Sequence, residues 1–243
     1  MPPAAPTGRS MPTARLRIGG FHTGDPTSDE SSPAVDVRVV FFALIGGRLV
    51  VALRNGDDQL CLPRGWPVSD ESLDAAARRI AHDEIGLSDR YLEQLYTFSV
   101  EDEIDWTVVI TYVGLVGSDA SAGSRPGIEW VPAEPGVLCS EIDGRVIDYA
   151  RTRLRAKLGY TTIALYLLPP AFTFRDLQST YETVLDQPLD KRNFRRRLLA
   201  TGMLERTEEV SRQGSHRPAA LYRFRPTDDQ ERYLTPAWDE ESS

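Results

Sequence analysis

The stretch GWPVSDESLDAAARRIAHDEIGL, residues 65–87, places a loop, a helix and a glycine stop one after another. Proline, glycine and serine near its start indicate the loop. Ser69 or Asp70 is then positioned to cap a helix that runs to about Ile85 and ends at Gly86. The stretch therefore predicts a helix behind a glycine-containing loop, and the sequence on both sides indicates what this helix packs against.

Runs rich in β-branched and aromatic residues lie on both sides of this helix. Residues 34–45 and 48–54 are separated by Gly46 and Gly47, which predicts a β-hairpin. Three further strands and a second helix are predicted at residues 95–100, 106–116 and 128–131 and at about 141–158. A helix among strands needs a sheet face on which to bury its apolar side. The sequence therefore predicts an α/β fold with a mixed sheet between helices.

The spacing of glycines and charged residues in the opening stretch resembles the Nudix box of the pyrophosphohydrolases. In that family the box reads G, five residues, E, seven residues, REU, one residue, EE, one residue and GU, where U is aliphatic. The positions that match outright are Gly65, Glu71, Arg79, Glu84, Gly86 and Leu87. Asp83 and Ala81 are conservative departures, whereas Ile80 stands where the box has a glutamate. The resemblance implies a Nudix fold.

Ile80 removes one of the carboxylates that the chemistry of the box requires. Cleavage of a diphosphate uses divalent cations held by carboxylate oxygens, and a base for the attacking water. Positions 80, 83 and 84 share one face of a helix, so Asp83 and Glu84 remain as a weak or vestigial metal site. We therefore expect a ligand binder that is not an enzyme and requires no cofactor, with Mg²⁺ entering only together with a phosphorylated ligand. The expected ligand-binding residues are Arg54, Arg64, Gly65, Glu71 and Arg79.

Two other interpretations of this helix stay open. Leu73, Ala77 and Ile80 recur at helical spacing, which also describes an ordinary amphipathic helix in an unrelated α/β domain. Alternatively, Glu71, Asp83 and Glu84 form a reduced metal site, and the protein is a slow Nudix pyrophosphohydrolase that acts on a nucleoside diphosphate derivative. Incubation with ADP-ribose and magnesium distinguishes a hydrolase from a binder.

The positive charge of the chain is concentrated near its C-terminal end. The whole chain has a net charge of −8, but residues 160–226 hold 11 basic and 7 acidic residues, net +4. This segment predicts a short helix ended by Pro169, a helix capped by Thr173 and a basic helix ended by Gly202. Two extended runs, MLERTEEV and AALYRF, follow. Three helices followed by a two-stranded ribbon are typical of a winged helix.

The basic helix has an apolar face and a polar face. Phe194, Leu198 and Thr201 recur at helical spacing and are expected to pack inward. On the other face, arginine and asparagine can form bidentate hydrogen bonds to bases, while flanking cations suit phosphates. The expected DNA-binding residues are Lys191, Arg192, Asn193, Arg195 and Arg196 on the helix, and Arg212, Ser215, His216 and Arg217 on the wing. A solvated basic face and a protein-interaction module are the alternatives.

The segment FTFRDLQSTYETVLDQPLDKRNFRRRLLATGMLE, followed by HRPAALYRF, resembles the C-terminal domain of the Nudix-related transcriptional regulators, the NrtR family. These proteins fuse a Nudix domain, usually no longer hydrolytic, to a winged helix. Both halves match in this order over about residues 35–224. The resemblance implies a homodimeric repressor that binds a palindromic DNA operator. Its Nudix domain is expected to sense ADP-ribose or a related nucleotide or sugar metabolite, with NAD metabolism as the regulated process.

Three departures from the family lie in the expected sensor half. Where the family usually has LPGG, this chain has LPRG, so Arg64 stands beside the expected pocket. The segment VEDEIDWTVVI lacks a DPR-type insertion, and SEIDGRVIDYA lacks the DH pair that precedes the linker helix. The DNA-binding half therefore follows the family pattern more closely than the sensor half does.

The sequence divides into four predicted segments. A disordered N-terminal extension (1–34), a Nudix-like ligand-sensing domain (35–158), a winged-helix domain (159–226) and an acidic flexible tail (227–243) follow one another. No apolar run is long enough to span a membrane and the N-terminus lacks a secretory core, so we expect a cytoplasmic protein without a membrane partner. Two cysteines without a CxxC pair argue against a zinc site and a disulfide scaffold.

Overall fold

The computed structural model describes residues 34–56, 59–86, 91–101, 106–117, 125–137, 139–211 and 219–225. The predicted N-terminal extension, apart from Ala34, and the predicted acidic tail lie outside the described residues. The expected wing contacts and one Nudix-box position also lie outside them: Arg212, Ser215, His216, Arg217 and Leu87. Within the described part, no helix is long and apolar enough to cross a membrane.

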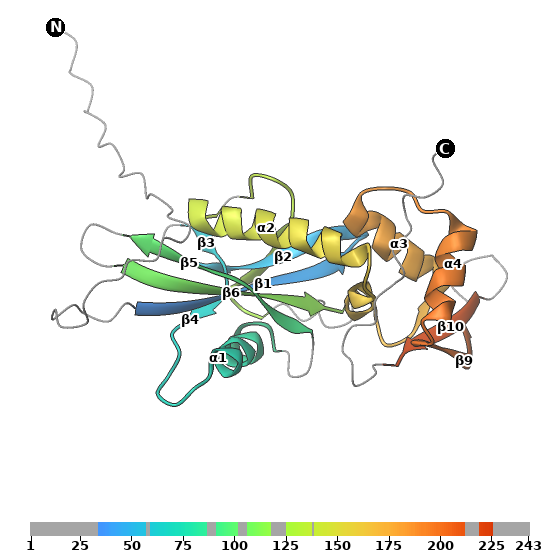
Figure 1. Cartoon of the computed structure of the whole chain (residues 1–243), viewed down its shortest axis with the longest axis horizontal. Coiled ribbons are helices and arrows are strands. Elements are labelled where there is room, and N and C mark those ends of the chain that lie inside the picture. The colour runs from blue at the N-terminus through green and yellow to red at the C-terminus, as the bar shows by residue number, and fades with distance from the viewer. Residues whose placement is uncertain are drawn as a thin grey trace, which may run out of the picture.

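A mixed sheet forms the centre of the N-terminal part (Figure 1). Its strands are β1 (Ala34–Ile45), β2 (Arg48–Asn55), β3 (Leu60–Cys61), β4 (Arg64–Gly65), β5 (Leu92–Glu101), β6 (Trp106–Val116) and β7 (Ile128–Pro132). The order is β3-β2-β1-β6-β5, with β4 paired to β1 and β7 to β2. β1 and β6 are parallel, whereas β1 and β2 form the predicted antiparallel hairpin. The predicted α/β fold with a mixed sheet is confirmed.

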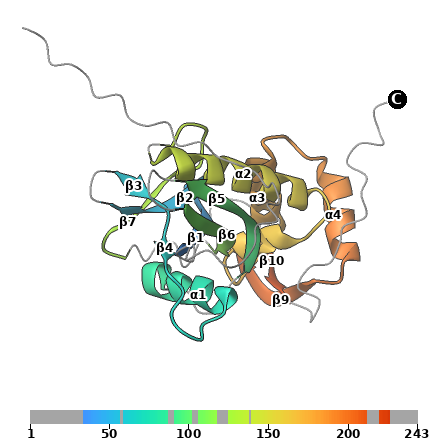
Figure 2. The same cartoon turned by 60° about the vertical axis from the view of Figure 1, so that its left-hand side comes forward.

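Helices cover both faces of this sheet (Figures 1 and 2). α1 (Leu73–Ile80) continues as a π-helical turn, η1 (Ala81–Ile85), on one face, and α2 (Glu141–Leu158) lies on the other. Successive residues of a strand point to opposite faces, so β1 serves both layers. Val39 packs in the core beneath α1, and Val40 packs in the core beneath α2.

The start of α1 differs from the sequence-based expectation. Its N-cap is Ser72, whose Oγ accepts a hydrogen bond from the amide of Ala75 at 3.2 Å, so the prediction of Ser69 or Asp70 was wrong. Asp70 instead adopts a left-handed conformation, with φ of 63°, inside the loop. The predicted stop at Gly86 is confirmed, with φ of 77°.

The C-terminal part is built from short helices and a small sheet (Figure 1). Its elements are the 3₁₀ turn η2 (Ile163–Leu167), β8 (Phe172–Thr173), α3 (Phe174–Leu185), α4 (Lys191–Ala200), β9 (Leu204–Ser211) and β10 (Ala219–Phe224). The predicted ribbon of β9 and β10 gains a third strand, because β8 pairs with β10. Thr173 caps α3, as predicted, and the structure adds a reciprocal capping box with Asp176. The predicted winged helix is confirmed.

The two parts share one apolar core. Leu154 and Leu158 of α2 belong to the same cluster of buried residues as Tyr181 of α3 and Phe194 of α4. The predicted inward positions Phe194 and Leu198 are each 1% exposed, whereas Thr201 is half-buried and donates its hydroxyl to the carbonyl of Leu198 at 2.7 Å. The apolar packing is therefore continuous from the sheet through α2 to the winged helix.

Candidate functional site

Glu71 and Arg79 form the bidentate pair that gives the loop after Gly65 its shape. Arg79 Nε donates to Glu71 Oε1, and Arg79 Nη2 donates to Oε2, both at 2.8 Å. Arg79 also donates to the carbonyl of Trp66 at 2.9 Å, while the amide of Val68 donates to Glu71 at 3.0 Å. The hydrogen bonds from Arg79, and then the one from Val68, lower the pKa of Glu71 to about 2. Both predicted ligand residues thus hold the loop on α1.

Ile80 is a core residue that faces the same loop. Its side chain is 2% exposed and belongs to the apolar core beneath α1, together with Val37 and Phe41. A Cβ added at Gly65 would lie 3.4 Å from Ile80 Cγ1, which shows how closely β4 approaches this side chain. The position that carries a glutamate in the Nudix box is therefore directed at the glycine loop and is filled here by hydrocarbon.

The carboxylates of Asp83 and Glu84 have partners within the protein. Glu84 Oε1 lies 3.3 Å from Nη1 of Arg54 on β2, and Asp83 Oδ1 lies 3.1 Å from Nδ1 of His82. The structure thus brings predicted Arg54 and Glu84 together. Among the described residues, no group of three histidine, cysteine, aspartate or glutamate side chains could hold a metal ion. The donor set of the predicted metal site is therefore two carboxylates, each already in contact with another side chain.

Two half-exposed guanidinium groups lie near Cys61, that of Arg54 toward Glu84 on the α1 side of the sheet and that of Arg64 toward Asp36 on the α2 side. The side chain of Arg54 is 39% exposed and that of Arg64 is 50% exposed. The pKa of the Cys61 thiol is raised, because burial and the charge of Asp143 outweigh the opposite effect of these two arginines and of Arg38. Each of these guanidinium groups can form charge-assisted hydrogen bonds to a phosphate group.

Arg64 also belongs to a group of ion pairs that the sequence analysis did not identify. Arg38 donates to Asp36 at 2.9 Å and to Asp143 at 2.6 Å, and Arg64 Nη1 lies 3.8 Å from Asp36 Oδ2. Burial lowers the pKa of Arg38, but attraction and hydrogen bonds to Asp143 and Asp36 outweigh this effect and raise it. The signal in the sequence was a pair of charges two residues apart in the apolar run AVDVRVV.

A second residue that was missed, Arg125, contacts the C-terminal end of the Nudix box at Asp83 and Gly86. Its Nη1 donates to the carbonyl of Asp83 at 2.7 Å. A Cβ added at Gly86 would lie 3.0 Å from Arg125 Nε, so the guanidinium passes directly over this glycine. Nothing in the local sequence links residues 42 positions apart, because the contact depends on how the segment before β7 lies against η1.

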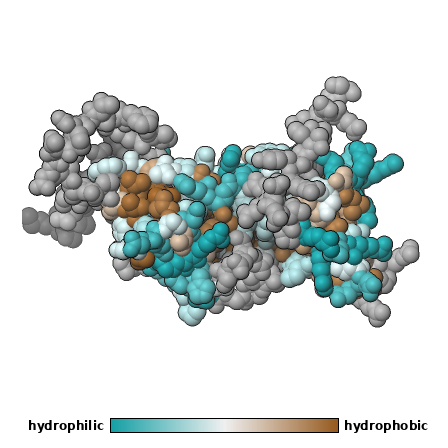
Figure 3. Space-filling view, turned by 60° about the horizontal axis from the view of Figure 1, so that its bottom comes forward, coloured by the Kyte–Doolittle hydropathy of each residue, from teal (hydrophilic) through white to brown (hydrophobic). Residues whose placement is uncertain are grey.

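The exposed face of α4 carries the predicted DNA contacts. Lys191, Arg192 and Arg196 are exposed and Asn193 is half-buried, while Phe194 anchors the opposite side of the helix. Hydrophilic side chains gather over this end of the molecule, at the right of Figure 3. The structure thus brings the predicted helix residues together on one surface.

Arg195 is oriented differently from its neighbours. Its guanidinium carbon lies 4.4 Å from the ring centroid of Phe174 on α3, and its Nη2 donates to the hydroxyl of Tyr222 on β10 at 3.0 Å. The rings of Phe174 and Tyr222 are themselves in edge contact at 4.9 Å. Arg195 therefore joins α4 to α3 and to the wing.

A groove runs beside Arg195 between α3, α4 and the wing strands. Its acidic side chains are engaged locally: Asp176 accepts hydrogen bonds from Thr173, and Glu182 accepts from the amide of Leu189 at 2.9 Å. Exposed Arg175, which the sequence analysis missed, and Lys191 remain as positive side chains along its wall. Arg175 follows the capped start of α3, and that position was the available signal.

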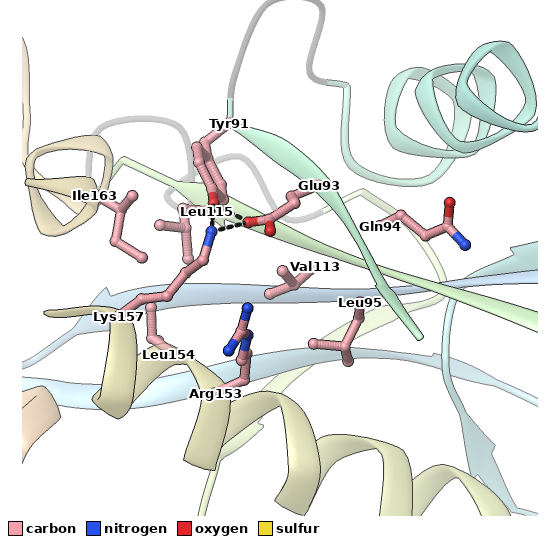
Figure 4. A pocket seen from close by; sticks show the side chains of 10 residues that line it. All are labelled: Tyr91, Glu93, Gln94, Leu95, Val113, Leu115, Arg153, Leu154, Lys157 and Ile163. Carbon is pink, nitrogen blue, oxygen red and sulfur yellow. Dashed lines mark hydrogen bonds and ion pairs between the residues drawn. The ribbon is translucent and has the colours of Figure 1, made fainter. Parts of the chain in front are cut away.

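A small cavity marks the junction between the sheet and α2 (Figure 4). Lys157 of α2 points across it and forms an ion pair with Glu93 and a hydrogen bond to Tyr91 at 3.2 Å, both at the start of the β5 segment. The ring of Tyr91 contacts Tyr166 of η2 at 5.3 Å, and Tyr166 contacts Phe224 of β10 at 5.1 Å. This cluster thus connects the sheet, α2 and the winged helix.

Comparison with known proteins gives matches to both parts. Residues 164–224 match the family described as the NrtR DNA-binding winged helix domain. Over 211 residues the chain is 33% identical to the ADPR responsive transcriptional repressor NtrR of Acinetobacter baylyi, covering 81% of this chain and 84% of that protein.

Solved structures agree with this assignment. The structure of Shewanella oneidensis NrtR complexed with a 27mer DNA is 27% identical and matches with a TM-score of 0.73, over 83% of this chain and 99% of that chain. A MutT/nudix family protein from Enterococcus faecalis, 19% identical, shares the fold with a TM-score of 0.62, over 80% of this chain and 89% of that chain. With the Nudix fold followed by the winged helix, these matches establish that the chain belongs to the NrtR family of transcriptional regulators.

Proposed function

We propose that this protein is a transcriptional repressor that releases its operator when its Nudix-like part binds ADP-ribose or a related nucleotide or sugar metabolite. The observation that carries the proposal is the basic surface of α4, held in place by buried Phe194 and Leu198, in the same chain as a Nudix fold that carries the half-exposed Arg54 and Arg64. The Acinetobacter relative is named as ADPR responsive, and the Shewanella relative is described in complex with DNA. As an operator-binding protein, it is expected to act in the cytoplasm.

In this proposal, α4 is the recognition helix. Arg192, Asn193 and Arg196 face the bases of the major groove, and Lys191 contacts phosphate. A homodimer presents two such helices to successive major grooves of a palindromic operator, because the two-fold symmetry of the protein then matches that of the DNA. The predicted wing contacts, made by Arg212, Ser215, His216 and Arg217, are to the DNA backbone or the minor groove.

The Nudix-like part is proposed to bind its ligand without efficient hydrolysis. Ile80 contributes no oxygen ligand, and the carboxylates of Asp83 and Glu84 are engaged with His82 and Arg54. Loss of a catalytic carboxylate commonly costs several kcal/mol of transition-state stabilisation. Arg54, Arg64 and the backbone of Gly65 bind the ligand's phosphates, and Mg²⁺ is not required, although it can accompany the diphosphate.

A competition assay tests the proposal. The full chain is bound to a labelled DNA fragment from upstream of its own operon and is challenged with unlabelled copies of that fragment or with scrambled DNA. We expect specific competition at least about 10³-fold stronger than that by scrambled DNA. Equal competition by the two DNAs would contradict operator recognition, and absence of any DNA binding would favour the protein-interaction alternative.

A slow pyrophosphohydrolase is the second candidate, because Asp83 and Glu84 keep two carboxylates at the end of the box. Incubation with ADP-ribose and Mg²⁺, followed by separation of AMP and ribose phosphate, measures this activity. We expect turnover far below the range of about 1–10³ s⁻¹ that is typical of enzymes. Turnover within that range would replace the binding proposal with the enzymatic one.

A further inference from the structure

The buried ion pairs beneath α2 have an imbalance of charge. The side chains of Asp36, Arg38 and Asp143 are 5%, 9% and 2% exposed, so two carboxylates share one buried guanidinium. A buried charge is costly unless it is compensated. In the described part of the chain, the second cation near Asp36 is Arg64, at 3.8 Å. Arg64 therefore supplies the second positive charge for these two carboxylates from a half-exposed position.

Arg64 is held less firmly than Arg38. Arg38 forms hydrogen bonds to both carboxylates at 2.6 and 2.9 Å, whereas the Arg64 contact is longer and its side chain is half-exposed. Arg64 also precedes Gly65 in β4, on the loop that is proposed to receive the ligand. A phosphate group at this loop can therefore compete with Asp36 for the same guanidinium.

The buried group fixes the start of α2. Asp143 lies in the first turn of this helix, and its Oδ2 accepts a hydrogen bond from the amide of Leu62 at 3.1 Å, just before the ligand loop. α2 has 18 residues, which corresponds to a length of about 27 Å. Near its far end, Arg155 Nε donates to the carbonyl of Val184 in α3 at 2.9 Å. One continuous helix thus connects the ligand loop to the winged helix.

We propose that Arg64 couples ligand binding to operator release. This inference rests on the proposed function and adds its regulation. A ligand phosphate draws Arg64 away from Asp36, and the buried group is left with an excess negative charge. An arrangement in which Asp143 moves away from Asp36 is then favoured, and α2 carries the winged helix with it. The ligand binds the two arrangements with different affinity, which is what allosteric coupling requires.

Calorimetry on the full chain tests this role. The Kd for ADP-ribose is measured for the free protein and for the protein bound to its operator, and the ratio of the two values is the coupling factor. For the wild type we expect a ratio of roughly 5 to 150, with the operator complex binding ADP-ribose more weakly. We expect the ratio to fall to about one in Arg64→Ala and to be partly restored in Arg64→Lys.

The matched control is Arg54→Ala, which removes the other half-exposed arginine proposed to bind the ligand, whose partner is Glu84 and not the buried group beneath α2. We expect both Kd values to rise by the same factor in this variant, so that the ratio stays at the wild-type value. If Arg64→Ala behaves in the same way, Arg64 is only a ligand contact and the coupling role is overturned.

Asp36→Asn covers the case in which Arg64→Ala binds too weakly to measure. It leaves Arg38 and Asp143 as a balanced pair and releases Arg64, so we expect ADP-ribose to bind at least as well as to the wild type, with a ratio near one. An unchanged ratio in this variant overturns the inference. A wild-type ratio of one, or a wild type that does not bind DNA, contradicts the proposed function itself and is thus distinguishable.

Discussion

Arg195 of α4 lies between Phe174 of α3 and Tyr222 of β10, with its guanidinium over the ring of the first and hydrogen-bonded to the hydroxyl of the second. The contact joins three elements of the winged helix through one side chain. The contact distinguishes Arg195 from Lys191, Arg192 and Arg196 of α4, which are exposed and carry the predicted DNA contacts. Because Arg195 is engaged in these contacts, we do not expect it to contribute to the salt dependence of DNA binding.

Arg195→Met is expected to weaken DNA binding without changing its salt dependence. The variant keeps the apolar stem but loses the cation–π contact and the hydrogen bond, at a cost of about 1 to 2 kcal/mol in the stability of the domain. In a salt titration, Lys191→Met is the matched comparison, because removal of a phosphate contact lowers the slope of log K against log salt by about 0.9. A similar drop in slope for Arg195→Met would identify Arg195 as a phosphate contact instead.

Arg192→Ala is expected to relax specificity at one base pair. A bidentate contact between arginine and guanine contributes about 1–3 kcal/mol of discrimination, so the variant should bind the operator and its single-base variants with similar affinity at that position. Binding to a panel of operator variants measures this effect. The control is Arg145→Ala, an exposed arginine on α2, for which the panel should be unchanged.

The pair of Glu71 and Arg79 should make folding sensitive to acid. Its hydrogen bonds lower the pKa of Glu71 from the ordinary value of 4.5 to about 2. A depressed pKa means that the stabilisation is fully present above about pH 4.5 and is lost as the pH falls toward 2. The free energy of unfolding of Glu71→Gln should therefore vary less with pH in this window than that of the wild type. Parallel curves for the two proteins would show that the pair does not contribute.

Ile80→Ala tests whether position 80 is part of the core. Removal of a buried aliphatic side chain leaves a cavity, and we expect a loss of about 2–5 kcal/mol in the free energy of unfolding, measured by urea denaturation. Ile45 is 39% exposed, so Ile45→Ala serves as the control and should cost less than about 1 kcal/mol. A small effect at position 80 would mean that the residue does not pack as the structure describes.

The elements that were predicted correctly depend on local signals. Gly86 has the left-handed conformation that is common where a helix ends. Thr173 forms its capping box with Asp176, three residues later. The end of the first helix and the start of α3 therefore each depend on neighbouring residues. The hairpin of β1 and β2 follows in the same way from Gly46 and Gly47. Such features could be predicted because the physical interaction and the sequence pattern lie in the same few residues.

The contacts that were missed depend on tertiary structure. Arg38 and Asp143 are 105 residues apart, and only the packing of α2 on the sheet brings them together. The direction of Arg195 was missed for a similar reason, since helical spacing places it on a flank but does not show that Phe174 and Tyr222 lie there. The cap of α1 was misplaced because several polar residues precede the helix and each can serve as an N-cap by its residue type, whereas Ser72 takes this position in the structure.

The affinity for operator DNA, measured by fluorescence anisotropy over a range of salt concentrations with and without ADP-ribose, tests the central proposal most directly. We expect log K to fall linearly with log salt, by about 0.9 for each phosphate contact, and saturating ADP-ribose to weaken binding by roughly 5- to 150-fold. An affinity that changes neither with salt nor with ADP-ribose would contradict the proposal that this protein is a ligand-responsive repressor.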